Sequence, residues 1–313
     1  MSAELLFGID GGATKTECIV SGIDGHEMVV VRGGPTNHEH VGYEKAAGEV
    51  KKIVFQALKE INATVTDIAA ACFAMGGMDI PPDRSHIMET IVTPLGLSCP
   101  IKIINDAFAG FRAGSARGVG VMVSLGSGIT FCGGNELGEM AQFEKPQPQS
   151  LLSRIFNALL AEYQRIGPQC TFRNAFLKAA GYKSLQALAW SLYAISRSYI
   201  SKPDHSRFPL AREVVFRKKF EHDPVLHDIF AHLGDEFAEI LIGLARRLDL
   251  CQKDFDLVLS GSILTKGRNH ILNGHIIEGV KTHCPLARPV IVDGPPAKGA
   301  ILIARELFIQ QRD

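Results

Sequence analysis

The chain has 313 residues, a length that suits two domains of ordinary size better than one small core. Its 33 lysine and arginine residues balance its 33 aspartate and glutamate residues, so no net basic charge is present to attract nucleic acid or anionic lipid. We therefore expect a small-molecule ligand, and neither nucleic acid nor a membrane as a partner.

The first third of the sequence alternates between strand and helix patterns. Short apolar runs predict strands, and the Asp24-Gly25 pair predicts the turn of a hairpin. Apolar residues at helical spacing predict helices over 43–61 and around 87–95. The expected strands are 5–10, 16–23, 27–31, 68–75 and 101–106.

The strand and glycine pattern begins again at Gly118, where residues 118–134 predict a second strand, glycine-rich turn and strand. This weak internal repeat indicates two related halves. The alternation of strands and helices is typical of an α/β fold, and the crossover helices imply parallel strands.

The remainder of the chain is mostly helical in pattern from 151 to 248. Asp223 and Pro224 stand where the cap and the first-turn proline of a long helix belong. A buried strand, a turn and a short strand should follow, with the strands at 255–262 and 289–294, before a last helix that begins at Ala297.

The motif FGIDGGATKT is the sharpest chemical signal, because a strand ends in Asp10 and enters a turn that starts with Gly11 and Gly12. Glycines let backbone N–H groups approach an anion closely, and phosphate is the expected guest. Thr14 and Lys15 would face the phosphates, while Asp10 would hold Mg²⁺ through water. The alternative is an ordinary tight turn, since neither a Rossmann nor a P-loop pattern is present.

Two further glycine segments would complete a nucleotide site. Gly126 and Ser127 could grip the same phosphates from the opposite side, although an ordinary hairpin turn explains them as well. Gly261 and Ser262, at the end of a buried strand, would let an adenine ring approach the backbone, and a strand-to-helix turn is the alternative.

Asp106 ends the predicted strand 101–106, where ligands of open α/β sheets bind. A carboxylate there could accept the proton of a hydroxyl group that attacks a phosphoryl group. The alternative is that Asp106 caps a helix that starts at Ala107.

Five segments in this order resemble the nucleotide-site segments of the superfamily of sugar kinases, heat-shock chaperones and actin. The whole chain resembles the BadF/BadG/BcrA/BcrD ATPase family, and particularly its N-acetylglucosamine kinase-like branch. The five segments are FGIDGGATKT, INDAFAGFRAG, VSLGSGI, LVLSGS and PPAKGA.

The resemblance implies two ribonuclease-H-like (actin-like ATPase) domains, with ATP and Mg²⁺ in the cleft between them and closure on sugar binding. The expected domains are 1–117, for acceptor and phosphate, and 118–313, enlarged by helices, with a last helix that can pack back on the first domain. A homodimer is also implied. Asn37, Gly76, Gly77 and Asp106 would contact the sugar, with Asp106 as the base. Gly12, Thr14, Gly126, Ser127, Gly261 and Ser262 would contact ATP.

The sequence departs from the family pattern at two places. Leu125 stands where the family usually has threonine in a GTGS loop, which predicts weaker ATP binding or turnover. The segments GGWG and GDEGSGY, which close over the sugar, are not recognisable after Gly134. Glu136 or Glu139 could replace the missing acidic contact, but a solvated loop carboxylate is the commoner role.

We therefore expect an ATP-dependent phosphotransferase acting on an amino sugar or related hexose. Two alternatives remain: a non-kinase ATPase that activates a partner enzyme, and a relative that binds nucleotide or sugar without turnover. Seven dispersed cysteines without a CxxC pair, and no secretory or membrane-spanning pattern, favour the cytoplasm.

Overall fold

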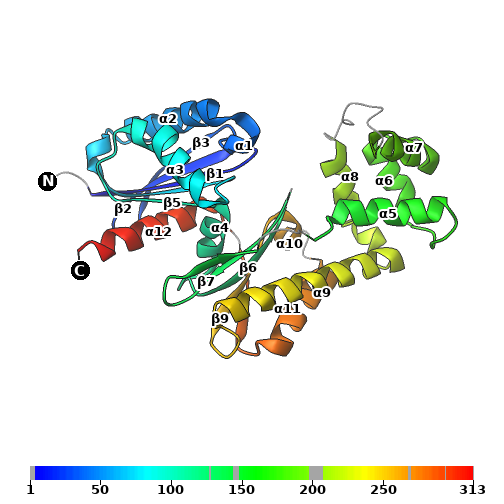
Figure 1. Ribbon diagram of the computed structural model, residues 1–313. Helices are drawn as coiled ribbons and strands as arrows, with labels where there is room; N and C mark the ends of the chain where they lie inside the picture. The colour runs from blue at the N-terminus through cyan, green and yellow to red at the C-terminus, as the bar shows by residue number, and fades with distance from the viewer. Residues whose placement is uncertain are drawn as a thin grey trace.

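The computed structural model describes residues 4–126, 128–143, 148–196, 207–266, 269–292 and 294–312. It contains two five-stranded sheets, and a group of helices extends beyond the second sheet (Figure 1). Within the described residues, no helix has both the length and the hydropathy needed to cross a bilayer.

The first sheet has the strand order β3-β2-β1-β4-β5. Its first three strands form an antiparallel meander, while β4 pairs parallel with both β1 and β5. The strands are β1 (Leu5–Gly11), β2 (Thr16–Gly22), β3 (Glu27–Gly33), β4 (Ile68–Met75) and β5 (Ile101–Ile104).

The second sheet repeats this plan with the order β8-β7-β6-β9-β10. Again three strands pair antiparallel, and β6, β9 and β10 are parallel. The strands are β6 (Gly120–Leu125), β7 (Ile129–Gly134), β8 (Met140–Gln142), β9 (Phe255–Ser260) and β10 (Ala287–Ile291). The weak sequence repeat therefore corresponds to a shared topology.

Helices cover both sheets and form a separate group of four at one end of the molecule, α5 to α8, called the helical lobe here (Figure 1). The helices of the first part are α1 (His38–Val41), α2 (Tyr43–Glu60), α3 (Pro81–Ile87) and α4 (Asp106–Gly114). The lobe contains α5 (Leu151–Tyr163), α6 (Arg173–Ala180), α7 (Leu185–Ser196) and α8 (Phe208–Val214). The others are α9 (Pro224–Arg247), α10 (Ser262–Thr265), α11 (His270–His283) and α12 (Ala297–Gln310).

A layer made by α4 and α12 joins the two sheets. Its core combines residues of the first sheet, such as Leu6 and Cys72, with Met122 and Val258 of the second. The two helices cross closely, because a Cβ atom at Gly299 of α12 would lie 1.9 Å from the carbonyl oxygen of Ala109 in α4. Only glycine permits this approach.

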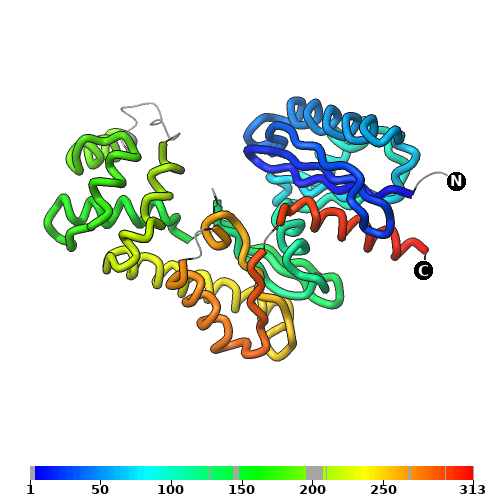
Figure 2. The backbone as a smooth tube through the Cα atoms, turned by 180° about the vertical axis from the view of Figure 1, so that it is seen from behind, coloured from blue at the N-terminus to red at the C-terminus, as the bar shows by residue number. Residues whose placement is uncertain are grey.

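The last helix runs back along the first sheet, so that the C-terminus comes close to the N-terminus (Figure 2). It contacts β1 and β4. Arg312 at its end pairs with Glu4 just before β1.

Several sequence expectations were incomplete. The expected strand 255–262 stops at Ser260, and the expected strand 289–294 is Ala287–Ile291. The expected strand 101–106 stops at Ile104, and the expected helix around 87–95 consists of α3, a π-helical turn Met88–Val92 and a 3₁₀ turn Thr93–Leu95. The segment expected to be a turn before the last strand contains α10 and α11. The short strand β8 was also missed, because three residues carry too little periodicity to be recognised.

Candidate functional site

The carboxyl ends of the parallel strands in the first sheet bring together the predicted acidic and sugar-binding residues. Asp10 lies near the end of β1, Gly76 follows β4 directly, and Asp106 follows β5 after one residue. Because β1, β4 and β5 are neighbours that run in one direction, these three positions share one edge of the sheet.

Gly76 lies at the centre of this group. A Cβ atom there would lie 3.1 Å from both Asn37 Nδ2 and Asp106 Oδ2, so these two side chains approach the same point. Gly77 adopts φ of +84°, and its missing side chain leaves room for Asn37 Oδ1. Asn37 itself caps α1 by accepting the N–H of Glu39 at 2.9 Å. The structure therefore gathers all four residues expected to contact a sugar.

Asp10 is an electrostatically unusual carboxyl group. Loss of water on burial raises its pKa to about 7, and the negative charge of Asp106 adds to this rise. Lys15 lowers the pKa, while Glu17 raises it further. The charge of Asp106 is therefore close enough to disfavour the ionised form of Asp10, and a cation bound between Asp10 and an anionic ligand would favour that form.

Asp106 is the first residue of α4 rather than its cap. Burial raises its pKa to about 6, the helix N–H of Ala107 opposes this rise, and the charge of Asp79 supports it. The cap is Asn105, whose Oδ1 accepts the N–H of Ala107 at 2.9 Å. The capping alternative for Asp106 is thus wrong, because Asn105 is the N-cap of α4.

Asn105 and Asp79 form a support that the sequence analysis missed. Asn105 is buried, and its Nδ2 donates to Asp79 Oδ1 at 2.8 Å while its Oδ1 caps α4. This pair links the turn after β4 to the start of α4. The signal was an asparagine between a strand and a helix, which is typical of a cap.

The Gly11-Gly12 turn forms backbone hydrogen bonds with Thr36 and Asn37, the segment expected to contact the sugar. The carbonyl oxygen of Gly12 accepts the backbone N–H groups of Thr36 and Asn37 at 3.1 and 3.2 Å, and its N–H donates to the Lys15 carbonyl oxygen at 3.0 Å. Thr14 and Lys15 are exposed at the tip of the turn. Phosphate groups and a sugar would therefore share a continuous edge.

The second sheet presents its own glycine residues at the equivalent edge. Gly261 caps α10 with φ of +84°, and a Cβ atom there would lie 2.4 Å from the Leu125 carbonyl oxygen at the end of β6. Gly126 and the first residue of α10, Ser262, thus lie at adjacent strand ends. Ser127 lies outside the described residues.

Leu125 does not intrude on this edge. Its side chain is 2% exposed and belongs to the core of the second sheet. The departure from the family loop therefore removes a hydroxyl group without placing an apolar side chain against the phosphates.

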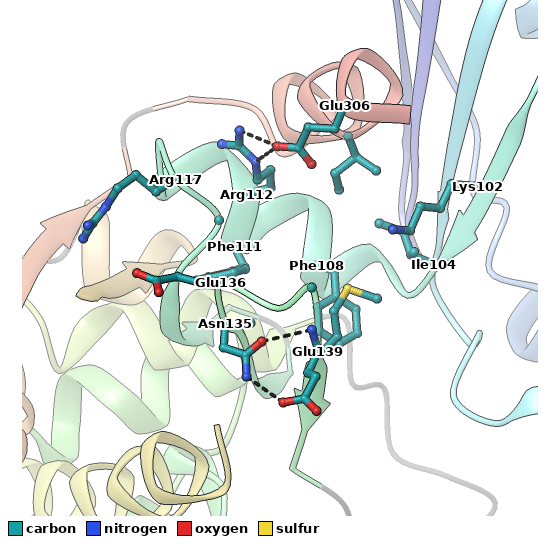
Figure 3. Close-up of a pocket in the computed structure, with 15 residues that line it drawn as sticks. Lys102, Ile104, Phe108, Phe111, Arg112, Arg117, Asn135, Glu136, Glu139 and Glu306 are labelled. Carbon is teal, nitrogen blue, oxygen red and sulfur yellow. Dashed lines mark hydrogen bonds and ion pairs between the residues drawn. The ribbon is translucent and has the colours of Figure 1, made fainter. Parts of the chain in front are cut away.

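Glu136 and Glu139 line a different place, a cavity of about 200 Å³ beside α4 and α12 (Figure 3). Glu139 accepts a hydrogen bond from Asn135 Nδ2 at 2.6 Å. Neither Asp10 nor Asp106 lines this cavity. The arrangement gives no support to the alternative that either glutamate replaces the missing sugar contact, which the sequence analysis ranked below a solvated loop role.

One cation reaches the second glycine turn from the helical lobe. Arg212 of α8 donates from Nη1 to the carbonyl oxygen of Gly126. Sequence reasoning missed this residue, because the two positions are 86 residues apart and no local pattern connects them.

Residues 7–146 match the BadF/BadG/BcrA/BcrD ATPase family. The match confirms, over this segment, the resemblance that the motifs indicated. Two curated relatives extend over nearly the whole chain.

An N-acetyl-D-glucosamine kinase of Dictyostelium discoideum is 22% identical over 322 residues, covering 97% of this chain and 98% of the relative. An N-acetylmuramic acid/N-acetylglucosamine kinase of Clostridium acetobutylicum is 22% identical over 308 residues, covering 96% and 98%.

Solved structures share the fold. A protein assigned as an N-acetylglucosamine kinase from Chromobacterium violaceum has a TM-score of 0.70 at 18% identity, covering 97% of this chain and 100% of that one. A ROK family glucokinase from Streptomyces griseus, solved with glucose and AMPPNP, has a TM-score of 0.57 at 14% identity, covering 96% and 99%. The expected two-domain sugar kinase and actin-like architecture is confirmed.

Proposed function

We propose that this relative of the BadF/BadG/BcrA/BcrD ATPases is an ATP-dependent kinase that phosphorylates an amino sugar or a related hexose. The observation that carries the proposal is the convergence of Asn37 and Asp106 on Gly76, beside Asp10, at the strand ends of the first sheet. The names of the curated relatives support N-acetylglucosamine as the first sugar to test.

Asp106 acts as the base in this proposal. A pKa of about 6 leaves the carboxylate ionised at neutral pH yet far more basic than an ordinary aspartate. The sugar hydroxyl would lie between Asp106 Oδ2 and the amide of Asn37, with Gly76 leaving the room. Its oxygen bonds to the terminal phosphorus of ATP, the bond to ADP breaks, and the proton passes to Asp106.

The nucleotide would be held by both glycine edges. Gly11, Gly12, Thr14 and Lys15 face its phosphates from the first sheet. Gly126 and Ser127 face the phosphates from the second sheet, while Gly261 and Ser262 take the adenine. We propose that the domain boundary lies between residues 117 and 118 and that the domains close on the sugar.

Asp10 fits a role in binding Mg²⁺. Among the described residues no group of three His, Cys, Asp or Glu side chains could form an all-protein metal site. Magnesium in kinases is typically held by one or two carboxylates together with phosphates and water, and the ion supplies neutralisation of phosphate charge. Asp10, with its pKa raised by burial and by Asp106, offers one such carboxylate.

The test is a coupled assay of ADP release with Mg-ATP and a panel of hexoses and N-acetylhexosamines. We expect ADP release that depends on an N-acetylhexosamine and is abolished by Asp106→Asn, with ATP binding largely retained. No sugar-dependent release from any panel member would contradict the kinase proposal. Equal loss of ATP affinity in the variant would mean that Asp106 is not the base.

A second candidate is a relative that binds ATP or sugar without turnover. The loss of the loop hydroxyl at Leu125 and the absence of a recognisable GDEGSGY segment favour it. Thermal shifts with ATP and sugar, but no ADP release, would support this candidate.

The third candidate, an activating ATPase with an iron–sulfur cluster, needs accessible thiolates. Burial raises the pKa of Cys72 to about 12 and also raises that of Cys132. A colourless, iron-free protein would contradict that role.

We also expect a homodimer in a reducing compartment such as the cytoplasm. The dimer rests on the family resemblance, and light scattering of the purified protein would test it. The compartment rests on the seven cysteines, which are all free thiols.

A further inference from the structure

Arg212 differs from the other partly buried arginines in the part of the chain that the structure describes. Arg112, Arg154 and Arg173 each form an ion pair with a glutamate side chain. Arg212 is also partly buried, but among the described residues no carboxylate pairs with it. Its known hydrogen bond is to a neutral group, the carbonyl oxygen of Gly126.

Among the described residues, most donors of this guanidinium have no protein partner. The group has five N–H donors in a fixed fork that matches carboxylate and phosphate oxygens. Burial lowers the pKa of Arg212, and the adjacent Glu213 opposes that decrease. A desolvated cation of this kind would be stabilised by an anion.

The turn that Arg212 contacts has room for such an anion. A Cβ atom at either Gly126 or Gly128 would meet no atom within 4 Å. The Gly126 N–H donates to the Gly128 carbonyl oxygen at 3.0 Å across the turn. The guanidinium therefore lies at the border of an open space flanked by backbone groups.

We propose that Arg212 binds the terminal phosphoryl group of the nucleotide when a triphosphate occupies this turn. The proposal rests on the function proposed above, which brings phosphate to Gly126, and it adds a residue from outside both glycine motifs. The free N–H donors would turn from solvent to the phosphoryl oxygens, because charge-assisted hydrogen bonds to phosphate are stronger than one to a carbonyl oxygen. The helical lobe would thus contact the group that is transferred.

The test compares the affinities of AMP, ADP and AMPPNP, with Mg²⁺, for the wild type, Arg212→Ala and Arg212→Lys. We expect Arg212→Ala to weaken AMPPNP at least about tenfold while AMP is unchanged, because one charge-assisted hydrogen bond is worth that much. Arg212→Lys should retain part of the affinity, since it keeps the charge but loses the fork. The control is Arg217→Ala, which removes an exposed arginine just beyond α8 and should leave all three affinities unchanged.

The outcomes separate this inference from the proposed function. A uniform loss of affinity for all three nucleotides in Arg212→Ala, or no loss for any, would overturn the role of Arg212 while leaving the kinase proposal intact. A wild-type protein that binds none of the three would overturn both. Melting curves without nucleotide show whether each variant is folded, and Arg212→Lys provides the comparison if the alanine variant is not.

Discussion

Asn105 shows how one buried side chain can position a reactive neighbour. Its side-chain Oδ1 accepts the N–H of Ala107 in the first turn of α4, and its Nδ2 donates to Asp79. Asp106 therefore lies between two segments that hydrogen bonds of Asn105 connect. The sequence placed Asp106 as the last residue of a strand, whereas β5 stops at Ile104 and Asp106 begins α4. The alternative that Asp106 caps the helix was wrong, because both Asn and Asp are good caps and the choice depends on where the strand stops.

Replacing Asn105 should therefore affect activity more than stability alone explains. Asn105→Ala should lower the free energy of unfolding by about 1 kcal/mol or more and reduce kcat at least about tenfold, because a misplaced base is costly. Asn269→Ala is the matched control, since Asn269 caps α11 by accepting the N–H of Leu272 at 2.9 Å. Urea unfolding and steady-state kinetics measure both. Similar kcat values in the two variants would contradict a positioning role.

The pKa of Asp106 predicts the acidic limb of the activity profile. Because the base must be ionised, kcat/KM for the sugar should fall about tenfold per pH unit below about pH 6. Asp79→Asn should move this limb to lower pH, since the charge of Asp79 helps to raise the pKa of Asp106. If the acidic limb of kcat/KM lies at the same pH in this variant as in the wild type, Asp79 does not raise the pKa of Asp106.

Arg212 marks the limit of prediction at this scale. The glycine turns carry a local pattern, whereas an arginine on a helix has no sequence feature that reveals its distant partner. Only the packing of the helical lobe brings α8 to Gly126.

At the scale of elements, patterns with strong periodicity were predicted well. The expected helix 43–61 is α2, and the expected cap and first-turn proline of α9 are Asp223 and Pro224. The helix α11 was overlooked although Leu272, Ile276 and Val280 occur at helical spacing and are fully buried.

Asp223 connects more than its own helix. One carboxylate oxygen accepts the N–H of Leu226 at 3.0 Å, and the other accepts the N–H and hydroxyl of Thr171 at 2.7 and 2.6 Å. Asp223→Ala should lower the free energy of unfolding by about 2–3 kcal/mol, because it leaves the buried N–H of Leu226 and the part-buried N–H and hydroxyl of Thr171 unpaired. The control Ser150→Ala removes the exposed cap of α5 and should cost about 1 kcal/mol or less. Equal losses would contradict the added role of Asp223.

At the scale of the molecule, the α/β class and the repeat were predictable because each half carries its own strand and glycine pattern. The layer between the sheets was not, since the pairing of α4 with α12 joins segments nearly 200 residues apart, as the Arg112–Glu306 contact across 194 residues illustrates. Sequence periodicity identifies an apolar face but not the element that covers it.

Two helical glycines, Gly299 at the crossing of α4 and α12 and Gly274 in open space, should respond in opposite directions when replaced by alanine. Gly299→Ala should lower the free energy of unfolding by about 2 kcal/mol or more, because the new Cβ meets the Ala109 carbonyl oxygen. Gly274→Ala in α11 has open space and should raise stability by up to about 1 kcal/mol through helix propensity. Urea unfolding measures both, and a stabilised Gly299→Ala would show that the helices cross less closely.

The shared strand order of the two sheets has a consequence for the direction in which a ligand can lie. If the strand-end edges of the two sheets were chemically the same, an elongated ligand between them could bind in either of two opposite orientations. Here the edges differ in charge, because the last two residues of β1 are Asp10 and Gly11, whereas those of β6 are Ser124 and Leu125. We expect this difference between the two strand ends to give bound ATP a single orientation, with its terminal phosphate toward Asp10 and the acceptor.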